Sequence, residues 1–382
     1  MSRVTIAAAL LALLCFTAGA VPAAPPAIVP PPIAARAFVL VDALSGQRLA
    51  AASEAERVEP ASLTKLMTAY LVFEAIRDGQ LALDRQVPAS AAAAAAPGAR
   101  MFLSPGQSAT IGELLRGLIV LSANDAAIAL AEGVATSERA FVERMNARAK
   151  RMGLADTSFA NATGEPAPGH HTCARDLATL ALALVRDFPQ HYALYAQREF
   201  SWNGLKQINR NRLLWTDPTV DGMQSGFTEA SGYGLVASAR RGERRLISVV
   251  VGAQSDTLRM AETQKLLNFG FQSWETRRLY KSGEPVATPR VYKGTADSVA
   301  LGFERDVWLT LPRERFEGLK AVLETRQPFM APLAAGQKAG IMKLTRDGAT
   351  VAEFPVVALE EVPVAGFLSR GWDTLKLLFL TP

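Results

Sequence analysis

The stretch Pro60-Ala61-Ser62-Leu63-Thr64-Lys65 opens a helical pattern and places a hydroxyl and an amine three residues apart. Residues i and i+3 share one face of a helix, so Lys65 could take the proton of Ser62 as its hydroxyl attacks a carbonyl. No other Ser-x-x-Lys occurs in the chain, and Gly79 offers an end for the helix. The apolar residues that set the helical spacing are Leu63, Leu66, Met67, Tyr70 and Phe73.

A position at the start of a buried helix would favour this chemistry at Ser62. The positive end of the helix stabilises an emerging alkoxide, and a lysine kept from water is held in its amine form. The alternative is a capping serine with an exposed lysine three residues on, since short motifs often match by chance. Whether Ser62 is a nucleophile or a capping serine therefore depends on whether the chain supplies further catalytic partners for it.

The composition predicts a folded, exported protein with two or more domains. The chain has 382 residues, of which 49% are apolar and 20% are charged, enough for sizeable cores. Residues 1–20 combine one charge, Arg3, with an apolar run and a small-residue end, which is the pattern of a secretory signal. Repeated prolines among alanines in 21–36 predict an extended tether.

Charge and cysteine content exclude several classes of function. Loss of Arg3 with the signal lowers the formal net charge from +5 to +4, which suits anionic lipid or a cell-wall polymer. No basic stripe with interleaved aromatics occurs, so nucleic acid is not expected as a partner, and the basic run 240–245 is expected to be a solvated hairpin tip. Without Cys15 of the signal, Cys173 has no disulfide partner and no surroundings of an activated thiolate.

Strand and helix patterns in residues 37–278 predict a mixed α+β domain, in which strands flank a helical block. The expected strands are at 38–42, 233–239 and 246–252. The expected helices are at 111–121, 125–133, 141–152 and 174–187.

Residues 279–362 change to short β-prone runs separated by turns. The runs at 307–311, 339–344 and 354–357 predict a small all-β sandwich. The last segment, 363–382, has the pattern of an amphipathic helix whose interior charges favour lying along an anionic membrane surface over crossing the membrane. A helix packed on its own domain is the alternative, because amphipathic helices of soluble proteins have the same pattern.

A serine nucleophile needs a proton shuttle, and two Ser-x-Asn stretches could supply one. Ser122-Ala123-Asn124 lies where one apolar helix breaks and another begins, whereas Ser201-Trp202-Asn203 lies in an aromatic, turn-like stretch. A loop between packed helices can aim side chains into a cleft, which favours Ser122 and Asn124.

With these motifs the chain resembles the low-molecular-mass penicillin-binding proteins, the serine D-alanyl-D-alanine carboxypeptidases. Their pattern combines Ser-x-x-Lys, Ser-x-Asn and Lys-Thr/Ser-Gly, and serine β-lactamases share it. The resemblance covers essentially the whole mature chain. It implies a penicillin-binding, β-lactamase-like transpeptidase domain followed by the β-sandwich and the terminal helix.

The third motif departs from the family pattern. After Asp221-Gly222-Met223, where the family has Lys-Thr/Ser-Gly, this chain has Gln224, Ser225 and Gly226, followed by Phe227. A literal Lys281-Ser282-Gly283 also occurs, but it follows a charged run and precedes Pro285, as a turn at a domain junction would. The flanking residues therefore assign the third-motif role to Gln224.

The resemblance implies that the family lysine attracts the terminal carboxylate of the substrate and hydrogen-bonds to the serine of the second motif. Gln224 can still donate through its amide, but it carries no charge. Losing a charge-assisted bond costs on the order of 1.5–3 kcal/mol, so activity is expected to be weakened. Arg210 and Arg259 match positions that resemble site-lining arginines of the family, and a guanidinium suits a planar carboxylate.

The implied mechanism is acyl transfer without a cofactor or metal. Ser62, deprotonated by Lys65, attacks the penultimate D-alanine carbonyl of a peptidoglycan stem peptide, and backbone N–H groups of Ser62 and Phe227 bind the oxyanion. Ser122 with Lys65 returns a proton to the departing D-alanine, and Asn124 positions the peptide. β-Lactams mimic this substrate and are expected to acylate Ser62. The expected location is the periplasmic side of the bacterial inner membrane.

Three other functions compete with this interpretation. A β-lactamase needs efficient deacylation, and the Glu-x-x-Leu-Asn signature is absent, since Gln264 takes the place of the glutamate before Leu267-Asn268. A weak or non-catalytic binder of peptidoglycan or β-lactams, with a morphological or regulatory role, is favoured by Gln224. A metal peptidase is disfavoured because the chain's histidines lack zinc-ligand spacing; they are His170, His171 and His191.

Overall fold

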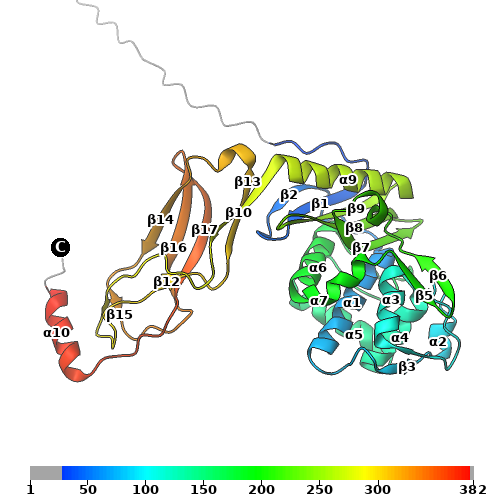
Figure 1. Ribbon diagram of the computed structural model, residues 1–382, viewed down its shortest axis with the longest axis horizontal. Coiled ribbons are helices and arrows are strands. Elements are labelled where there is room, and N and C mark those ends of the chain that lie inside the picture. The colour runs from blue at the N-terminus through cyan, green and yellow to red at the C-terminus, as the bar shows by residue number, and fades with distance from the viewer. Residues whose placement is uncertain (1–27, 379–382) are drawn as a thin grey trace, which may run out of the picture.

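The computed structural model describes residues 28–378, which form a larger and a smaller body side by side (Figure 1). The expected signal, 1–20, lies outside the described residues, and the described part of the tether, 28–36, contains no helix or strand. The expected boundary after residue 278 falls inside β10 (Trp274–Tyr280), a strand that leads from the larger body into the smaller one.

A five-stranded antiparallel sheet forms the centre of the larger domain. Side chains alternate across it: Val39 and Val249 join the core of the helical block, whereas Leu40 and Val250 pack with α9 (Asp256–Ser273) on the other face. Figure 1 shows helices on both sides of this sheet. The strands, in sheet order, are β2 (Arg48–Ala52), β1 (Ala37–Asp42), β9 (Arg244–Ala253), β8 (Gly232–Arg241) and β7 (Val220–Thr228).

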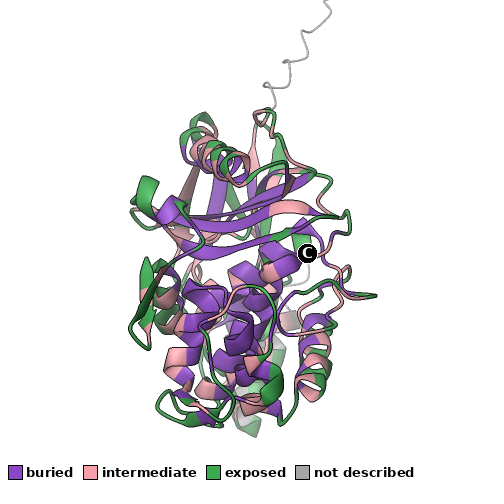
Figure 2. Ribbon diagram, turned by 90° about the vertical axis from the view of Figure 1, so that its right-hand side faces the viewer, coloured by how far each residue is buried: buried purple, intermediate pink, exposed green. Residues whose placement is uncertain are grey.

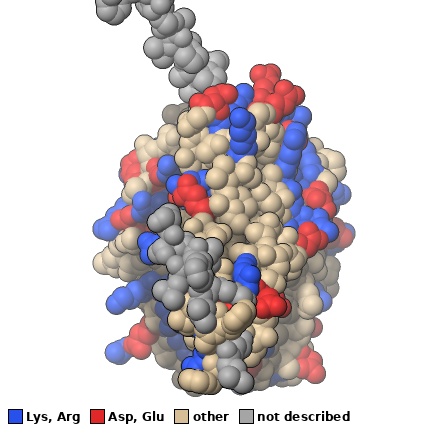
Figure 3. All heavy atoms as spheres, turned by 90° about the vertical axis from the view of Figure 1, so that its left-hand side faces the viewer, with Lys and Arg blue, Asp and Glu red and all other residues tan. Residues whose placement is uncertain are grey.

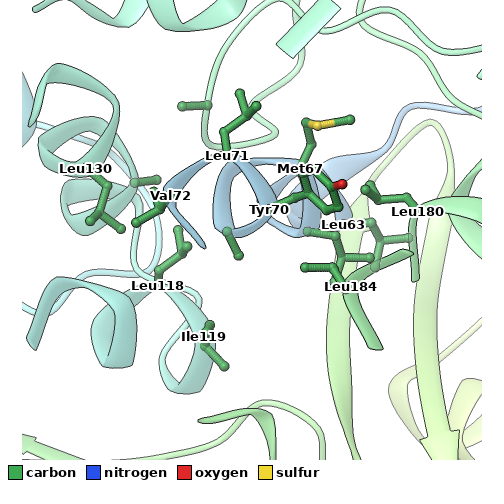
Figure 4. Packing of buried hydrophobic residues seen from close by; sticks show 14 of the residues in the cluster. Leu63, Met67, Tyr70, Leu71, Val72, Leu118, Ile119, Leu130, Leu180 and Leu184 are labelled. Carbon is green, nitrogen blue, oxygen red and sulfur yellow. The ribbon is translucent and has the colours of Figure 1, made fainter. Parts of the chain in front are cut away.

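Helix α1 (Lys65–Arg77) runs through the helical block and follows a short 3-10 turn, Ala61–Thr64. Its side chains Leu66, Met67 and Phe73 are fully buried in the core of the helical block. Figure 4 shows Met67 and Val72 of this helix among buried side chains of neighbouring helices. The helix ends at Arg77, and Gly79 adopts φ +71°, which confirms the stop expected there. The strands and inner helices carry most of the buried positions, and exposed ones lie on outer helices and loops (Figure 2).

The helices predicted in this domain are confirmed, with bounds that shift by at most three residues at either end. They are α3 (Ile111–Val120), α4 (Asn124–Ala135), α5 (Glu138–Arg151) and α6 (Ala174–Asp187). The shorter elements are β3 (Gln86–Pro88), α2 (Ala91–Ala94), β4 (Ser108–Thr110), α7 (Pro189–Tyr192), β5 (Glu199–Trp202), β6 (Leu205–Ile208) and α8 (Leu213–Thr216).

The smaller domain is all β, as predicted. A four-stranded sheet in the order β12-β17-β16-β14 packs with the pairs β10-β13 and β11-β15 around a core that includes Leu309, Met342 and Val356. The strands after β10 are β11 (Val291–Tyr292), β12 (Leu301–Gly302), β13 (Val307–Pro312), β14 (Lys320–Thr325), β15 (Phe329–Met330), β16 (Lys338–Arg346) and β17 (Ala349–Ala358).

Helix α10 (Phe367–Leu378) follows the smaller domain. Its carboxylate Asp373 Oδ2 accepts the backbone N–H of Lys293 at 2.6 Å, whereas Phe367 and Trp372 expose 82% and 64% of their surface. Within residues 28–378, no helix combines the length and the apolar character needed to cross a bilayer.

The hairpin at 240–245 corrects one expectation, because two of its arginines are not solvated. Arg244 Nε donates to the buried carboxylate of Asp42 at 2.8 Å, and Arg245 donates to both carboxylate oxygens of Asp221 at 2.7 Å. These partners come from other strands of the sheet. A basic run therefore supplies internal ion pairs that the local sequence pattern does not indicate.

Candidate active site

Ser62 lies in the 3-10 turn at the start of α1, where β7 and a loop converge on its backbone. Glycine is required on both sides of this approach. A Cβ on Gly226 of β7 would lie 3.2 Å from Ser62 N, and one on Gly164, at φ +95°, would lie 1.8 Å from the carbonyl oxygen of Ala61. The nucleophile candidate is thus held between two backbones and is itself half-buried.

Lys65 is the buried partner that the motif predicts. Its Nζ donates to Ser62 Oγ at 2.9 Å and to the carbonyl oxygen of Thr163 at 2.6 Å, and the residue is 1% exposed. Burial lowers the pKa of Lys65 from 10.5 to about 7, against the opposing charges of Glu165 and Asp125. A large share of the amine is therefore neutral near neutral pH and able to accept a proton.

Ser122 lies at the break between α3 and α4 and contacts Gln224 of β7. A capping box of Thr110 and Glu113 fixes the start of α3, and at its far end Ser122 adopts φ +58°. Gln224 Nε2 donates to Ser122 Oγ at 2.9 Å, with both residues buried. Ser201, the competing candidate, lies on β5 instead.

Asn124 is the first residue of α4 and holds two loops together. Its Nδ2 donates to the carbonyl oxygen of Pro97 at 2.7 Å and to Glu165 Oε1 at 2.8 Å. The next residue, Asp125, is fully buried and accepts backbone N–H groups of Met101 and Leu103 at 3.0 Å. Glu165 was not among the predicted residues, because nothing in its local sequence marks it; only the fold brings it to Asn124.

The third-motif residues lie along β7. Gln224 and Ser225 are buried, and Gly226 lies against Ser62. Phe227 is 44% exposed and packs on Tyr233 with ring centroids 4.4 Å apart. The hydrogen bond to Ser122 that the family lysine would make is thus made by the Gln224 amide.

The two predicted arginines differ in placement. Arg259 on α9 is 8% exposed and uses Nη1 to bind the carbonyl oxygens of Gly226 at 2.9 Å and Gly234 at 3.1 Å. It also forms an ion pair with Asp256, so its charge is committed behind the sheet. Arg210 is exposed in the loop after β6 and, among the described residues, forms no salt bridge.

The residues that the sequence disfavours as catalytic groups do not contact Ser62 or Lys65 through any hydrogen bond found among the described residues. Lys281 pairs with Glu284 at 3.1 Å, and Ser282 donates to the carbonyl oxygen of Glu304 at 2.7 Å, in the smaller domain. Cys173 is fully buried at the start of α6, and burial raises the pKa of its thiol to about 11. His170 is buried beside Thr64, where burial lowers its pKa to about 4.

Comparisons with known proteins agree with this geometry. The family model described as D-alanyl-D-alanine carboxypeptidase matches residues 24–255, and that of the penicillin-binding protein 5 C-terminal domain matches residues 274–364. The chain is 41% identical to D-alanyl-D-alanine carboxypeptidase DacC of Escherichia coli, over 91% of this chain and 89% of that protein. It is 40% identical to DacD of Salmonella typhimurium, over 97% of both chains.

Solved structures give the same result. Penicillin-binding protein 5 from Haemophilus influenzae matches with a TM-score of 0.85 and 37% identity, over 88% of this chain and all of that one. Penicillin-binding protein D2 from Listeria monocytogenes, in its ampicillin-bound form, matches with a TM-score of 0.58 and 28% identity, over 63% of this chain and 98% of that one. The chain therefore belongs to the D-alanyl-D-alanine carboxypeptidases of serine peptidase family S11.

Proposed function

We propose that this carboxypeptidase removes the terminal D-alanine of peptidoglycan pentapeptide stems through an acyl-enzyme at Ser62, and that β-lactams acylate the same hydroxyl. The observation that carries the proposal is the 2.9 Å hydrogen bond from Lys65 Nζ to Ser62 Oγ, made by an amine whose pKa is about 7. A base with a pKa near the working pH is both present in the right form and strong enough to take the proton.

In the first half of the reaction, Lys65 accepts the hydroxyl proton as Ser62 Oγ bonds to the carbonyl carbon of the penultimate D-alanine. The developing oxyanion is bound by the backbone N–H groups of Ser62 and Phe227. Ser122 relays the proton from Lys65 to the amine nitrogen, and the bond to the terminal D-alanine breaks. Water then attacks the ester, and Ser62 recovers its proton as the shortened stem leaves.

Gln224 makes this enzyme weaker than relatives that carry a lysine there. Its amide donates to Ser122 Oγ, which keeps the shuttle in place, but it offers no charge to the substrate carboxylate. Arg259 cannot substitute readily, because its guanidinium already binds the carbonyl oxygens of Gly226 and Gly234. Arg210, which is exposed, is then the other arginine that could bind the substrate carboxylate.

Gln224 also favours a second candidate function. The chain could bind peptidoglycan or β-lactams with little turnover and serve a morphological or regulatory role, because the site cation is missing at Gln224. Release of D-alanine distinguishes the two functions.

The protein is exported and held on the periplasmic face of the inner membrane by α10. The exposed aromatic rings of Phe367 and Trp372 suit the boundary between headgroups and acyl chains. On the face that carries α10, basic and acidic side chains are mixed wherever described residues are visible (Figure 3). Attachment is therefore expected to rest mainly on apolar insertion.

Replacing the nucleophile tests the function directly. Ser62→Ala is expected to lose the covalent adduct with fluorescent penicillin and to slow D-alanine release from a pentapeptide by roughly 10⁴-fold or more. Ser201→Ala, on β5, is the matched control and should keep both activities. A stable adduct on the Ser62→Ala protein, found by intact-mass measurement, would refute the assignment.

The protonation of Lys65 predicts the pH dependence of acylation. Below pH 7 the amine is mostly charged and cannot accept the Ser62 proton, so the second-order rate with penicillin should rise as pH increases through about 7 and level off above it. Stopped-flow labelling between pH 5 and 9 measures this, with circular dichroism as a check that the fold persists. A rate independent of pH across this interval would contradict the role of Lys65.

Restoring the missing charge should raise activity. Gln224→Lys is expected to increase kcat/KM for D-alanine release by roughly 10- to 150-fold, the equivalent of a charge-assisted bond of about 1.5–3 kcal/mol. Gln80→Lys adds the same charge at an exposed position outside the site and should leave kcat/KM unchanged. If Gln224→Lys gives no increase, the weakened activity has another cause.

Removing α10 tests the membrane attachment. A chain ending at Gly366 keeps the backbone contacts of residues 293–295 with 363–365 and should still react with penicillin. It is expected to stay in solution when vesicles containing phosphatidylglycerol are sedimented, whereas the chain with α10 sediments with them. Equal sedimentation of both proteins would exclude α10 as the anchor.

A further inference from the structure

Three consecutive residues of one loop each touch a different part of the site. The carbonyl oxygen of Thr163 accepts Lys65 Nζ at 2.6 Å, Gly164 lies against the backbone at Ser62, and Glu165 Oε1 accepts Asn124 Nδ2 at 2.8 Å. The loop thus touches Lys65, the backbone at Ser62 and the side-chain amide of Asn124. Its last member, Glu165, places a carboxylate beside the Asn124 amide.

Hydrogen bonds fix the backbone of the loop that carries this carboxylate. Asn161 Oδ1 accepts the N–H groups of Thr163 at 3.2 Å and Gly164 at 2.7 Å, and Asn161 Nδ2 donates to the backbone oxygen of Glu165 at 2.8 Å. Thr163 Oγ1 accepts the N–H of Glu165 at 3.2 Å. Preorganisation of this kind lowers the ordering cost of binding a ligand.

Two carboxylates act on Lys65, and only one of them can meet a ligand. Asp125 is fully buried and accepts backbone N–H groups of Met101 and Leu103. Glu165 is exposed and forms no salt bridge within the described part of the chain. A solvent-accessible carboxylate that forms no salt bridge and lies beside Asn124 is a binding group for a cation.

The Asn124 amide adds a second constraint. Both hydrogens of its Nδ2 are in use, one by Pro97 O and one by Glu165 Oε1. A peptide carbonyl that needs a donor from Asn124 must therefore replace the Glu165 carboxylate. The exchange is favourable when the incoming peptide also supplies a new partner for Glu165.

We propose that Glu165 binds the ammonium of an amine-bearing side chain on the stem-peptide residue immediately before the two terminal D-alanines. The assignment rests on the proposed function, because it assumes that Asn124 aligns this part of the stem. The ammonium draws the carboxylate from Asn124 Nδ2, which then donates to the peptide carbonyl. A peptide with a neutral side chain leaves Glu165 on Asn124 and has to compete with it.

The test compares two peptides that differ in one charge. They are Nα-acetyl-L-Lys-D-Ala-D-Ala, with a free side-chain ammonium, and the same peptide acetylated on that amine. The natural enzyme is expected to show kcat/KM roughly 3- to 10-fold higher for the free amine, mostly through KM, as for a partly exposed charge-assisted contact. Glu165→Gln should bring the ratio of the two peptides close to one.

Comparing ratios separates recognition from any general effect of the variant on catalysis. Glu143→Gln removes a charge from the exposed face of α5 and should keep the natural ratio. If the natural enzyme cleaves neither peptide, the proposed function fails, and protection of Ser62 from fluorescent penicillin by each peptide then measures the ratio without turnover. A natural ratio near one, or a preference that survives in Glu165→Gln, overturns the proposal.

Discussion

Burial of the Lys65 amine beside Ser62 is the constraint on which the cleft depends. At 1% exposure the side chain loses its hydration, and this loss, larger than the attraction of Glu165 and Asp125, brings the pKa to about 7. The amine keeps its position because Thr163 O and Ser62 Oγ take its hydrogen bonds. Gly164 and Gly226 allow close backbone approach at Ala61 and Ser62, next to this hydrogen-bonded pair.

The charges around this amine are distributed differently from what the family pattern implies. Gln224 keeps the hydrogen bond to Ser122 without the charge, and Arg259 spends its charge behind the sheet. Glu165 meanwhile adds a negative charge on the donor side. Under the proposed function, Gln224 and Arg259 offer little positive charge to the substrate carboxylate, and Glu165 places a negative charge beside Asn124. The proposed loss of rate and the proposed selectivity for an ammonium would then both follow from this distribution of charge.

The sequence predicted those features that depend on interactions within a short segment of the chain. The helix at 174–187 has the predicted bounds because its apolar spacing and its ends lie within the segment itself. Lys65 likewise donates to Ser62, three residues before it in the same helical turn. Helix α9 was not predicted from the sequence. Its buried face includes the polar residues Arg259, Glu262 and Thr263, so the apolar residues do not recur at a clear helical spacing. The contact of Glu165 with Asn124 spans 41 positions, so only the assembled fold could show it.

The junction between the domains is held by hydrogen bonds between residues that are far apart in the sequence. Asp42, at the end of β1, accepts Thr276 Oγ1 at 2.6 Å and Arg244 Nε at 2.8 Å, and Thr276 in turn lies 2.9 Å from Thr310 Oγ1. A buried charge with these partners is costly to separate, because the carboxylate would be left without compensation. The cluster therefore links β13 of the smaller domain to β1 of the larger domain's sheet, and α10 lies at the far end of the smaller domain in Figure 1.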